Sequence, residues 1–127
     1  MGVAYVANVN SNNVSVIDTK THEVIATVPG LTEPTDIAIT PDGKLAYVTS
    51  DNIGNIYVID TKTHSLVATI GTTERAFKTV FTPDGKLAYV ANDFDPGTVS
   101  VIDVKTHSVI ATVSVGVNPE AVVIIPN

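Results

Sequence analysis

Histidine is the residue in this chain best suited to hold a metal ion, and its three copies stand at equivalent positions. His22, His64 and His107 each close an Asp-Xaa-Lys-Thr-His segment. A metal site requires its ligands to converge on one ion at about 2 Å. Each histidine precedes a different predicted outer strand, so we expect the three side chains to diverge as solvated turn residues. The pattern therefore predicts no metal and no cofactor at these positions.

Charged residues at the starts of the predicted inner strands offer a second kind of chemistry. Asp36, Lys78 and Ala121 occupy one aligned position, and Glu120 precedes the last of them. In a ring of sheets this position lines the mouth of a central channel, where divergent residues suit contacts with a ligand. Asp36 and Lys78 equally suit an ion pair between neighbouring sheets, and such exposed pairs are common. We favour the ion pair and keep the channel-mouth contacts as the alternative.

Other polar residues give weaker indications of a site. Asp93 and Asp95 could offer oxygens to a calcium ion, but such a site takes six or more oxygens, so a polar loop is favoured. Asn, Asp and Glu side chains in loops on the same expected face could contact an unknown surface ligand. The sequence contains no nucleophile elbow, no glycine-rich phosphate loop and no cysteine. We therefore expect a protein that is not an enzyme.

The elements that must position these residues come from an internal repeat. Ala-Tyr-Val begins at residues 4, 46 and 88, and Val-Ile-Asp begins at residues 16, 58 and 101. Pro-Asp-Gly-Lys-Leu occurs at 41–45 and again at 83–87. The period is 42 residues, and 43 in the last copy, where one loop is a residue longer.

Each period reads as four short strands rich in Val, Ile, Tyr and Thr, bounded by turn residues. In the second copy the strands are predicted at Asp36–Thr40, Leu45–Ser50, Asn55–Asp60 and Ser65–Ile70. Four strands in a repeated period of about 40 residues predict an all-β fold, a β-propeller of four-stranded antiparallel blades. A plain β-sandwich is the alternative. We expect one propeller segment, 1–127, with repeats at approximately 1–40, 41–82 and 83–127.

Composition excludes two classes of partner. The 127 residues carry a formal net charge of −6 and only seven Lys and Arg residues, whereas nucleic acid requires clustered cations that neutralise phosphates. No apolar run reaches the roughly 18 residues of a membrane helix, so membrane insertion is not expected. Met1 and Gly2 lead directly into strand-like sequence, without the basic start of a signal peptide.

Three four-residue segments carry a family resemblance. Tyr5-Val6-Ala7-Asn8, Tyr47-Val48-Thr49-Ser50 and Tyr89-Val90-Ala91-Asn92 resemble the signature of the YVTN β-propeller repeats. The Val-Ile-Asp and Pro-Asp-Gly-Lys segments fit that pattern too, and the resemblance covers the whole chain. It implies a surface-layer-type propeller at the cell surface or outside the cell. Members of the family form closed rings, usually of seven blades, so three repeats depart from the pattern as a fragment would.

The two ends of the chain predict one blade split between the termini. Val3–Asn8 aligns with the second strand of a blade, and Glu120–Ile125 aligns with the first. Three blades do not close a ring, since propellers have roughly four to eight. We therefore expect pairing between the C-terminal strand of one chain and the N-terminal strand of the next. The pairing residues are Val3, Ala4, Tyr5, Val6, Ala121, Val122, Val123 and Ile124.

This pairing leads to an expected assembly and function. Two chains give six blades and three give nine, so a homodimer is favoured and a trimer is possible. The expected function is that of a self-assembling structural or binding scaffold. The alternative is an enzyme, a lactonase-like or metal-dependent hydrolase with its site in the central channel.

Overall fold

The computed structural model describes residues 2–72 and 75–126. In this part of the chain, eleven strands form three separate antiparallel sheets. We name them blade 1 (β1–β3), blade 2 (β4–β7) and blade 3 (β8–β11). The strands are β1 Val3–Asn8, β2 Asn13–Asp18, β3 Val24–Val28, β4 Asp36–Ile39, β5 Leu45–Ser50, β6 Asn55–Asp60, β7 Ser65–Gly71, β8 Ala76–Phe81, β9 Leu87–Asn92, β10 Thr98–Asp103 and β11 Ser108–Ser114.

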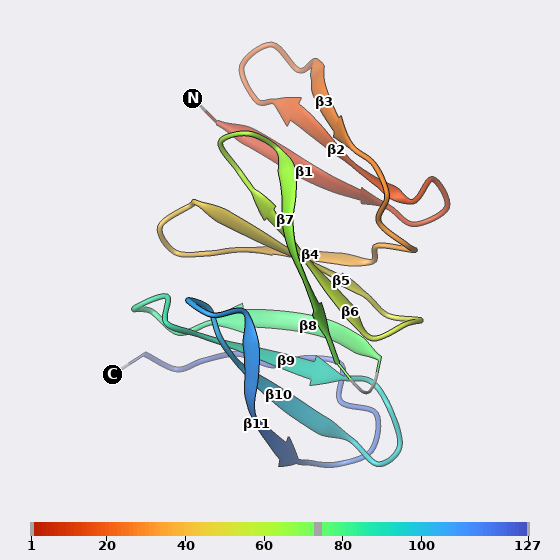
Figure 1. The fold of residues 1–127 in the computed structure, drawn as a ribbon, viewed down its shortest axis with the longest axis vertical. Coiled ribbons are helices and arrows are strands. Elements are labelled where there is room, and N and C mark those ends of the chain that lie inside the picture. Colours follow the sequence, from red (N-terminus) through yellow and green to blue (C-terminus); the bar gives the residue numbers. More distant parts are fainter. Residues whose placement is uncertain (1, 73–74, 127) are drawn as a thin grey trace.

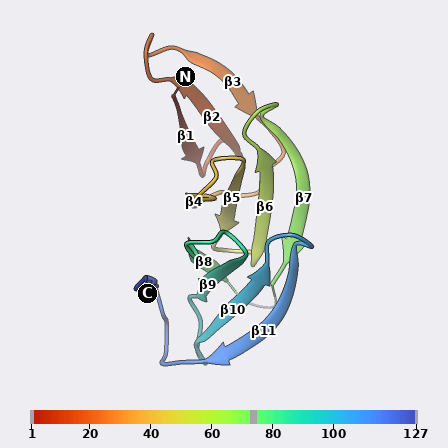
Figure 2. The ribbon, with the colours of Figure 1, turned by 90° about the vertical axis from the view of Figure 1, so that its left-hand side faces the viewer.

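The three blades stand in an arc. Figure 1 shows the sheets stacked along the long axis of the molecule, with the N-terminal end beside blade 1 and the C-terminal end beside blade 3. Figure 2 shows the outer strands β3, β7 and β11 on the convex side and β4 and β8 on the other. Within each complete blade the strands follow chain order from β4 to β7 and from β8 to β11. The predicted all-β propeller architecture is confirmed.

The hairpin between β4 and β5 shows why the sequence turns where it does. Gly43 has a φ of 75°, a left-handed conformation that glycine adopts without steric cost. Its amide donates to the Thr40 carbonyl at 2.8 Å, and the Asp42 carboxylate accepts from the Lys44 amide at 2.9 Å. The Thr40 hydroxyl also donates to Asp42 at 2.7 Å. The hairpin between β8 and β9 repeats the same bonds, so the turn is an intrinsic property of the Thr-Pro-Asp-Gly-Lys segment.

A β-bulge recurs where each outer strand joins its blade. The register shifts after Val16 in blade 1, after Val58 in blade 2 and after Val101 in blade 3. An extra residue on one strand increases the local twist and bends that strand. The recurring bulge therefore bends each outer strand at the same place along the blade.

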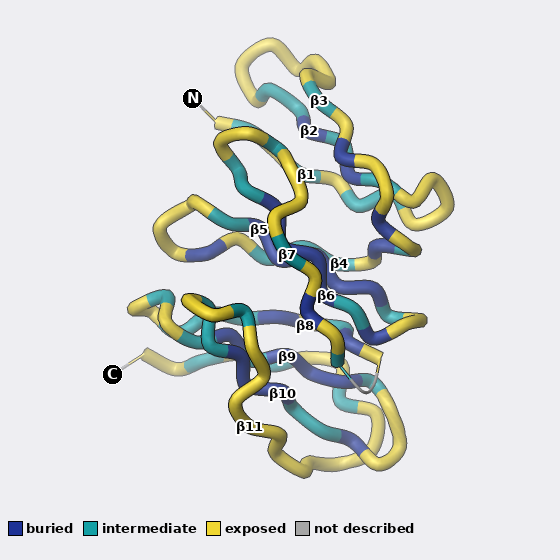
Figure 3. Tube along the Cα trace, viewed as in Figure 1, coloured by how far each residue is buried: buried dark blue, intermediate teal, exposed yellow. Residues whose placement is uncertain are grey.

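The core consists of two layers, one between each pair of neighbouring blades. Ala46, Val48 and Ile59 of blade 2 pack with Val14 and Val16 of blade 1. The opposite face of blade 2 packs on blade 3 and buries Tyr47 completely. Figure 3 shows that the buried residues concentrate at these two boundaries, while β11 is exposed along its length. Blade 2 is thus buried on both faces, as its nearly continuous apolar strands predict.

Blade 1 is the incomplete blade. It has three strands in the order β1-β2-β3, so β1 is its inner edge, whereas β5 and β9 pair with the inner strands β4 and β8. The predicted strand Glu120–Ile125 belongs to no sheet in this single chain, and residues 119–126 (the C-terminal segment) have an extended, unpaired path. Among the described residues, no helix has the length and apolarity needed to span a membrane.

Candidate functional site

The open inner edge of blade 1 is the first half of the candidate site. A hollow of about 360 Å³ lies beside β1 and is lined by Val3, Tyr5, Ile37 and Ile39 together with the turn residues Gly43 and Thr61. A second hollow, of about 330 Å³, continues along the same edge beside Tyr5 and Ile37. We name the two together the inner slot. It lies between β1 and β4, where the inner strand of a complete blade would stand.

The free face of blade 1 is the second feature of the site. Val6 is 41% exposed, whereas its equivalents Val48 and Val90 are completely buried. Ala4 is likewise exposed, although Ala46 and Ala88 are fully buried. In blades 2 and 3 these residues face the preceding blade and are covered by it. Blade 1 therefore presents an apolar face that fits a preceding blade.

The C-terminal segment carries a second exposed apolar surface. Val122 and Ile124 are half-buried, whereas Val123 is 80% exposed and Ile125 is 87% exposed. This alternation is that of a β-strand with one covered face. The segment returns along the side of blade 3 that carries β8 and β9 (Figure 2). The segment therefore has one face against its own chain and one apolar face open.

The crossover into this segment is held by close backbone contacts. The Val115 amide donates to the Gly97 carbonyl at 3.0 Å, and the Asn118 amide donates to the Phe94 carbonyl at 2.9 Å. A Cβ atom at Gly97 would overlap the Gly116 carbonyl oxygen and lie 2.7 Å from Cδ of Pro119. Only glycine at position 97 allows the chain to approach so closely.

Neighbouring blades are joined by a tyrosine–histidine contact that the sequence analysis missed. The Tyr5 hydroxyl lies 2.6 Å from Nδ1 of His64, and the Tyr47 hydroxyl lies 3.1 Å from Nδ1 of His107. Both histidines are half-buried. The expectation that they are solvated turn residues is therefore wrong for His64 and His107, because each ring folds back over the preceding blade. His22 is exposed as expected.

The electrostatics of this contact favour a neutral tyrosine. Burial, and secondarily the charge of Asp103, raise the pKa of Tyr47 to about 12. Burial and then the charge of Asp60 raise the pKa of Tyr5. A neutral phenol donates to Nδ1 of an imidazole that carries its proton on Nε2, and in the other tautomer Nδ1 donates to the phenol oxygen. The two contacts are therefore hydrogen bonds that need no charge on either ring.

The turn that holds each histidine is itself strongly defined. His22, His64 and His107 have φ values of 62°, 58° and 55°, in the left-handed region that histidine enters more readily than most residues. The Asp60 carboxylate accepts hydrogen bonds from the amides of Lys62 and Thr63, which lower the pKa of that carboxyl. The backbone conformation at each histidine is thus set by the Asp-Xaa-Lys-Thr-His segment itself.

The channel-mouth residues are placed as follows. Nζ of Lys78 lies 3.2 Å from Oδ1 of Asp36, so these two residues form an ion pair between blades 2 and 3. Both groups are partly exposed, and such a pair contributes little to stability. Glu120 is exposed in the C-terminal segment and takes no part in this ion pair. A ligand contact by any of the three stays a prediction.

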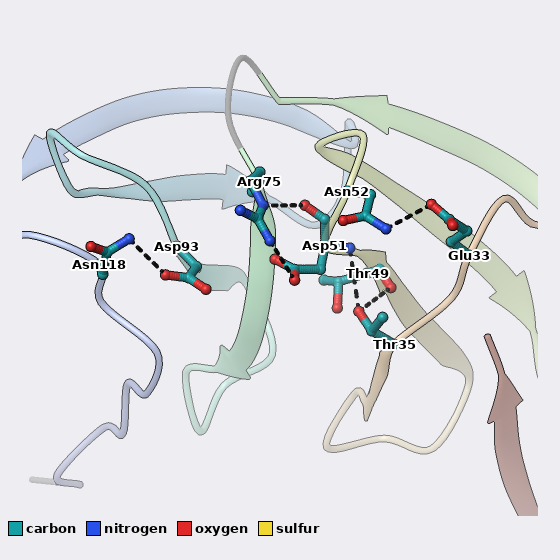
Figure 4. A network of polar contacts seen from close by, with 8 residues as sticks. All are labelled: Glu33, Thr35, Thr49, Asp51, Asn52, Arg75, Asp93 and Asn118. Atoms are coloured by element: carbon teal, nitrogen blue, oxygen red, sulfur yellow. Dashed lines mark hydrogen bonds and ion pairs between the residues drawn. The ribbon is translucent and has the colours of Figure 1, made fainter. Parts of the chain in front are cut away.

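A network of polar contacts joins the loops and crossovers that connect neighbouring blades (Figure 4). Arg75 pairs with Asp51 at 3.0 Å, and the Asn118 amide donates to Asp93 at 3.1 Å. Arg75 and Asn118 are equivalent crossover residues, and each reaches the loop of the preceding blade. Asp93 therefore contacts the crossover segment through one carboxylate oxygen. Among the described residues, no group of three His, Cys, Asp or Glu side chains could hold a metal ion.

Comparison with known proteins supports this architecture. A model of the YNCE-like beta-propeller family matches residues 2–85. The chain belongs to this family. No curated protein matches the chain in sequence.

Solved structures extend the likeness over most of the chain. Hydrazine synthase of Kuenenia stuttgartiensis is similar with 30% identity and a TM-score of 0.83, over 90% of this chain and 34% of that one. A functionally unknown protein from Desulfotomaculum acetoxidans is 21% identical with a TM-score of 0.83, over 91% and 37%. The dihydro-heme d1 dehydrogenase NirN is 21% identical with a TM-score of 0.78, over 91% and 26%. This YNCE-like chain thus spans between about a quarter and somewhat more than a third of each of these proteins.

Proposed function

We propose that this YNCE-like chain is a self-assembling propeller unit that acts as a structural and binding scaffold. In the proposed assembly, the C-terminal segment of one copy enters the inner slot of a second copy. The observation that carries the proposal is the pair of unsatisfied surfaces: the open inner edge of β1 and the extended segment whose Val123 and Ile125 face outward. A strand added to an open sheet edge is a common mode of association, and main-chain hydrogen bonds give it affinity.

The register of this pairing follows from the complete blades. Ile37 is opposite Val48, Ala38 is opposite Tyr47 and Ile39 is opposite Ala46. Blade 3 keeps the same register between β8 and β9 at the equivalent positions. Transferred to the termini, this register places Val122 opposite Val6, Val123 opposite Tyr5 and Ile124 opposite Ala4. It also places the side chain of Val123 against Tyr5 and Ile37, two apolar residues that line the inner slot.

Burial of the exposed apolar groups supports association of copies. Val6, Val123 and Ile125 are all on the surfaces that the junction would cover. Covering apolar surface is favourable by about 25 cal/mol per Å². An open sheet edge beside such a surface otherwise invites aggregation. Head-to-tail pairing would cover both the exposed apolar surface and the open sheet edge.

The number of copies follows from the number of blades. Each chain supplies three sheets, so two copies supply six blades and three copies supply nine. Propellers have roughly four to eight blades. We therefore propose a C2 homodimer, with a trimer as the next closed arrangement.

The scaffold would present the loop face shown in Figure 4 to a surface ligand. The loops there are polar and rest on a rigid frame, which is where binding residues are usually found. A location at the cell surface, implied by the family resemblance, is part of the proposal. A hydrolase site in the central channel stays the alternative.

Engineered cysteines test the proposed register. The unmodified chain has no cysteine, so any disulfide must come from the introduced residues. Ala4→Cys with Ile124→Cys would place two thiols directly opposite each other, within the Cα distance of a disulfide. We expect oxidation to give a covalently linked dimer, and a reductant to cleave the disulfide and release single chains under denaturing conditions.

A matched variant makes the test specific. Ala4→Cys with Val123→Cys moves one thiol by a single residue, to the opposite face of the same strand. We expect this pair to cross-link at least about tenfold more slowly, as its geometry requires backbone movement. Equal cross-linking of the two pairs would show that the segment does not bind in a defined register, and the proposal would fail.

A further inference from the structure

The tyrosine–histidine contact repeats at every blade boundary within the chain. Tyr5 of blade 1 contacts His64 of blade 2, and Tyr47 of blade 2 contacts His107 of blade 3. In each case the tyrosine of one blade meets the histidine of the next. Two residues remain outside this pattern, Tyr89 in the last blade and His22 in the first.

Tyr89 is positioned as the other two tyrosines are. It lies opposite Val80 on one side and Val101 on the other, as Tyr47 lies opposite Ala38 and Val58. Its ring therefore points to the face of blade 3 that is turned away from blade 2. Within residues 2–72 and 75–126, no hydrogen bond involves its hydroxyl, although the side chain is half-buried.

His22 is preset in the same way. Its φ of 62° matches the values of the two paired histidines, and its amide donates to the Asp18 carbonyl at 2.8 Å, as the His64 amide does to Asp60. The Asp18 carboxylate accepts from the Lys20 amide at 2.7 Å, which holds the turn. In the described part of the chain, the ring of His22 has no hydrogen-bond partner, and it is exposed where His64 and His107 are half-buried.

We propose that the Tyr89 hydroxyl of one copy donates a hydrogen bond to Nδ1 of His22 in a second copy. The inference rests on the proposed head-to-tail assembly and names the residues that specify its alignment. Blade 3 of one copy then faces blade 1 of the next in the arrangement that blades 1 and 2 already have. The contact occurs twice in a closed dimer and makes all six blade boundaries alike.

This contact supplies a specificity that strand pairing alone lacks. A slip of two residues keeps every side chain on its correct face, so the apolar pattern of residues 121–124 tolerates it. Such a slip moves the paired strand by about 7 Å, since each residue spans roughly 3.4 Å. A hydrogen bond does not survive that displacement. Tyr89 and His22 therefore select one register among those that the apolar residues permit.

The test measures dimer dissociation by analytical ultracentrifugation for four proteins: the unmodified chain, Tyr89→Phe, His22→Asn and the double variant. Phenylalanine keeps the ring and loses only the hydroxyl, and asparagine tolerates the left-handed conformation. Losing two hydrogen bonds of ordinary net strength raises the dissociation constant of each single variant by about 5- to 150-fold. We expect the dissociation constant of the double variant to be no higher than that of the single variant with the larger effect, because both changes remove the same contact.

Nitrogen NMR of the histidine rings provides a second readout. We expect His22 in the dimer to show the tautomer protonated on Nε2, with an Nδ1 shift that moves in Tyr89→Phe. In Tyr47→Phe the Nδ1 signal of His107 should move and that of His22 should not.

The outcomes separate the two proposals. An unmodified chain that stays monomeric at all concentrations would overturn both the assembly and this contact. A dimer whose dissociation constant is unchanged in Tyr89→Phe, or a double variant with additive effects, would overturn the contact and leave the assembly standing. A dimer with coupled losses in both variants would support the two together.

Discussion

The hydroxyl of Tyr47 lies 3.1 Å from Nδ1 of His107, across the boundary between blades 2 and 3. The two residues are 60 positions apart in sequence. The ring of Tyr47 also meets Phe81 edge to face, with centroids 5.0 Å apart. One side chain thus contributes an apolar ring to the core and a polar group to the rim of the same boundary.

The first prediction concerns this hydrogen bond. Tyr47→Phe should lower the free energy of unfolding by about 1 kcal/mol, the net worth of a typical hydrogen bond. The loss is modest because His107 is half-buried and its Nδ1 can turn to water. Urea denaturation followed by circular dichroism measures it. In a background carrying His107→Asn, the same substitution should have almost no further effect, and full additivity would exclude the bond as its cause.

The second prediction is a loss of stability at alkaline pH. The fold raises the pKa of Tyr47 to about 12, from about 10 in an unfolded chain, chiefly through burial. The neutral phenol is therefore favoured in the fold, and its contribution is complete below a pH of about 10. As the pH rises towards about 12, up to about 2 to 3 kcal/mol of unfolding free energy is lost.

Thermal unfolding at a series of alkaline pH values checks this dependence. Tyr47→Phe is the matched control, since it has no group to ionise at that position. Its stability should decline less steeply between pH about 10 and about 12. Parallel curves for the two proteins would show that Tyr47 ionises freely and does not couple to folding.

The third prediction concerns the crossover at Gly97. Gly97→Ala would bring a methyl group into the Gly116 carbonyl and to 2.7 Å from Cδ of Pro119. Overpacking of this kind costs about 1 to 3 kcal/mol, because backbone must move. Gly71→Ala is the control, since a Cβ atom there meets nothing within 4 Å and no positive φ is involved. Equal stability of the two variants in urea would contradict the close approach.

The fourth prediction separates assembly from folding. Val123→Asp should abolish the dimer, because a carboxylate in the inner slot lacks a partner and its burial costs several kcal/mol. The side chain is 80% exposed in the single chain, so folding itself should not suffer. Val117→Asp is the matched control: Val117 is 63% exposed, and the equivalent Thr32 is also exposed at the boundary between blades 1 and 2. Sizing chromatography should find that only Val123→Asp is monomeric.

Much of the fold could be predicted from the sequence because the same pattern of strands and turns recurs in three copies of the repeat. The hairpins, the strands Leu45–Ser50 and Asn55–Asp60, and the all-β propeller class follow from turn chemistry and apolar patterning, and the structure confirms them. The missing inner strand of blade 1 also follows, from the alignment of the two termini. Periodicity defines these features because each is local or recurs at a fixed distance.

The contacts between blades were harder to predict. Tyrosine and histidine recur with the same period, but the sequence does not show that the tyrosine of one blade reaches the histidine of the next. That contact depends on the left-handed conformation of His64 and His107 and on the spacing of the blades. The signal that could have found it is the nearly equal sequence separation of the partners, 59 residues in one pair and 60 in the other. The ion pair of Arg75 with Asp51 is formed at one boundary between blades, so the sequence repeat does not predict it.

The mass of the chain in solution tests the central claim most directly. Light scattering on a sizing column, over a range of concentrations, distinguishes the single chain of 13.3 kDa from its closed assemblies. The proposed six-bladed ring predicts one species at twice that mass, independent of concentration well above the dissociation constant. A stable, compact species at 13.3 kDa at every concentration would contradict the closure of the ring by a second copy.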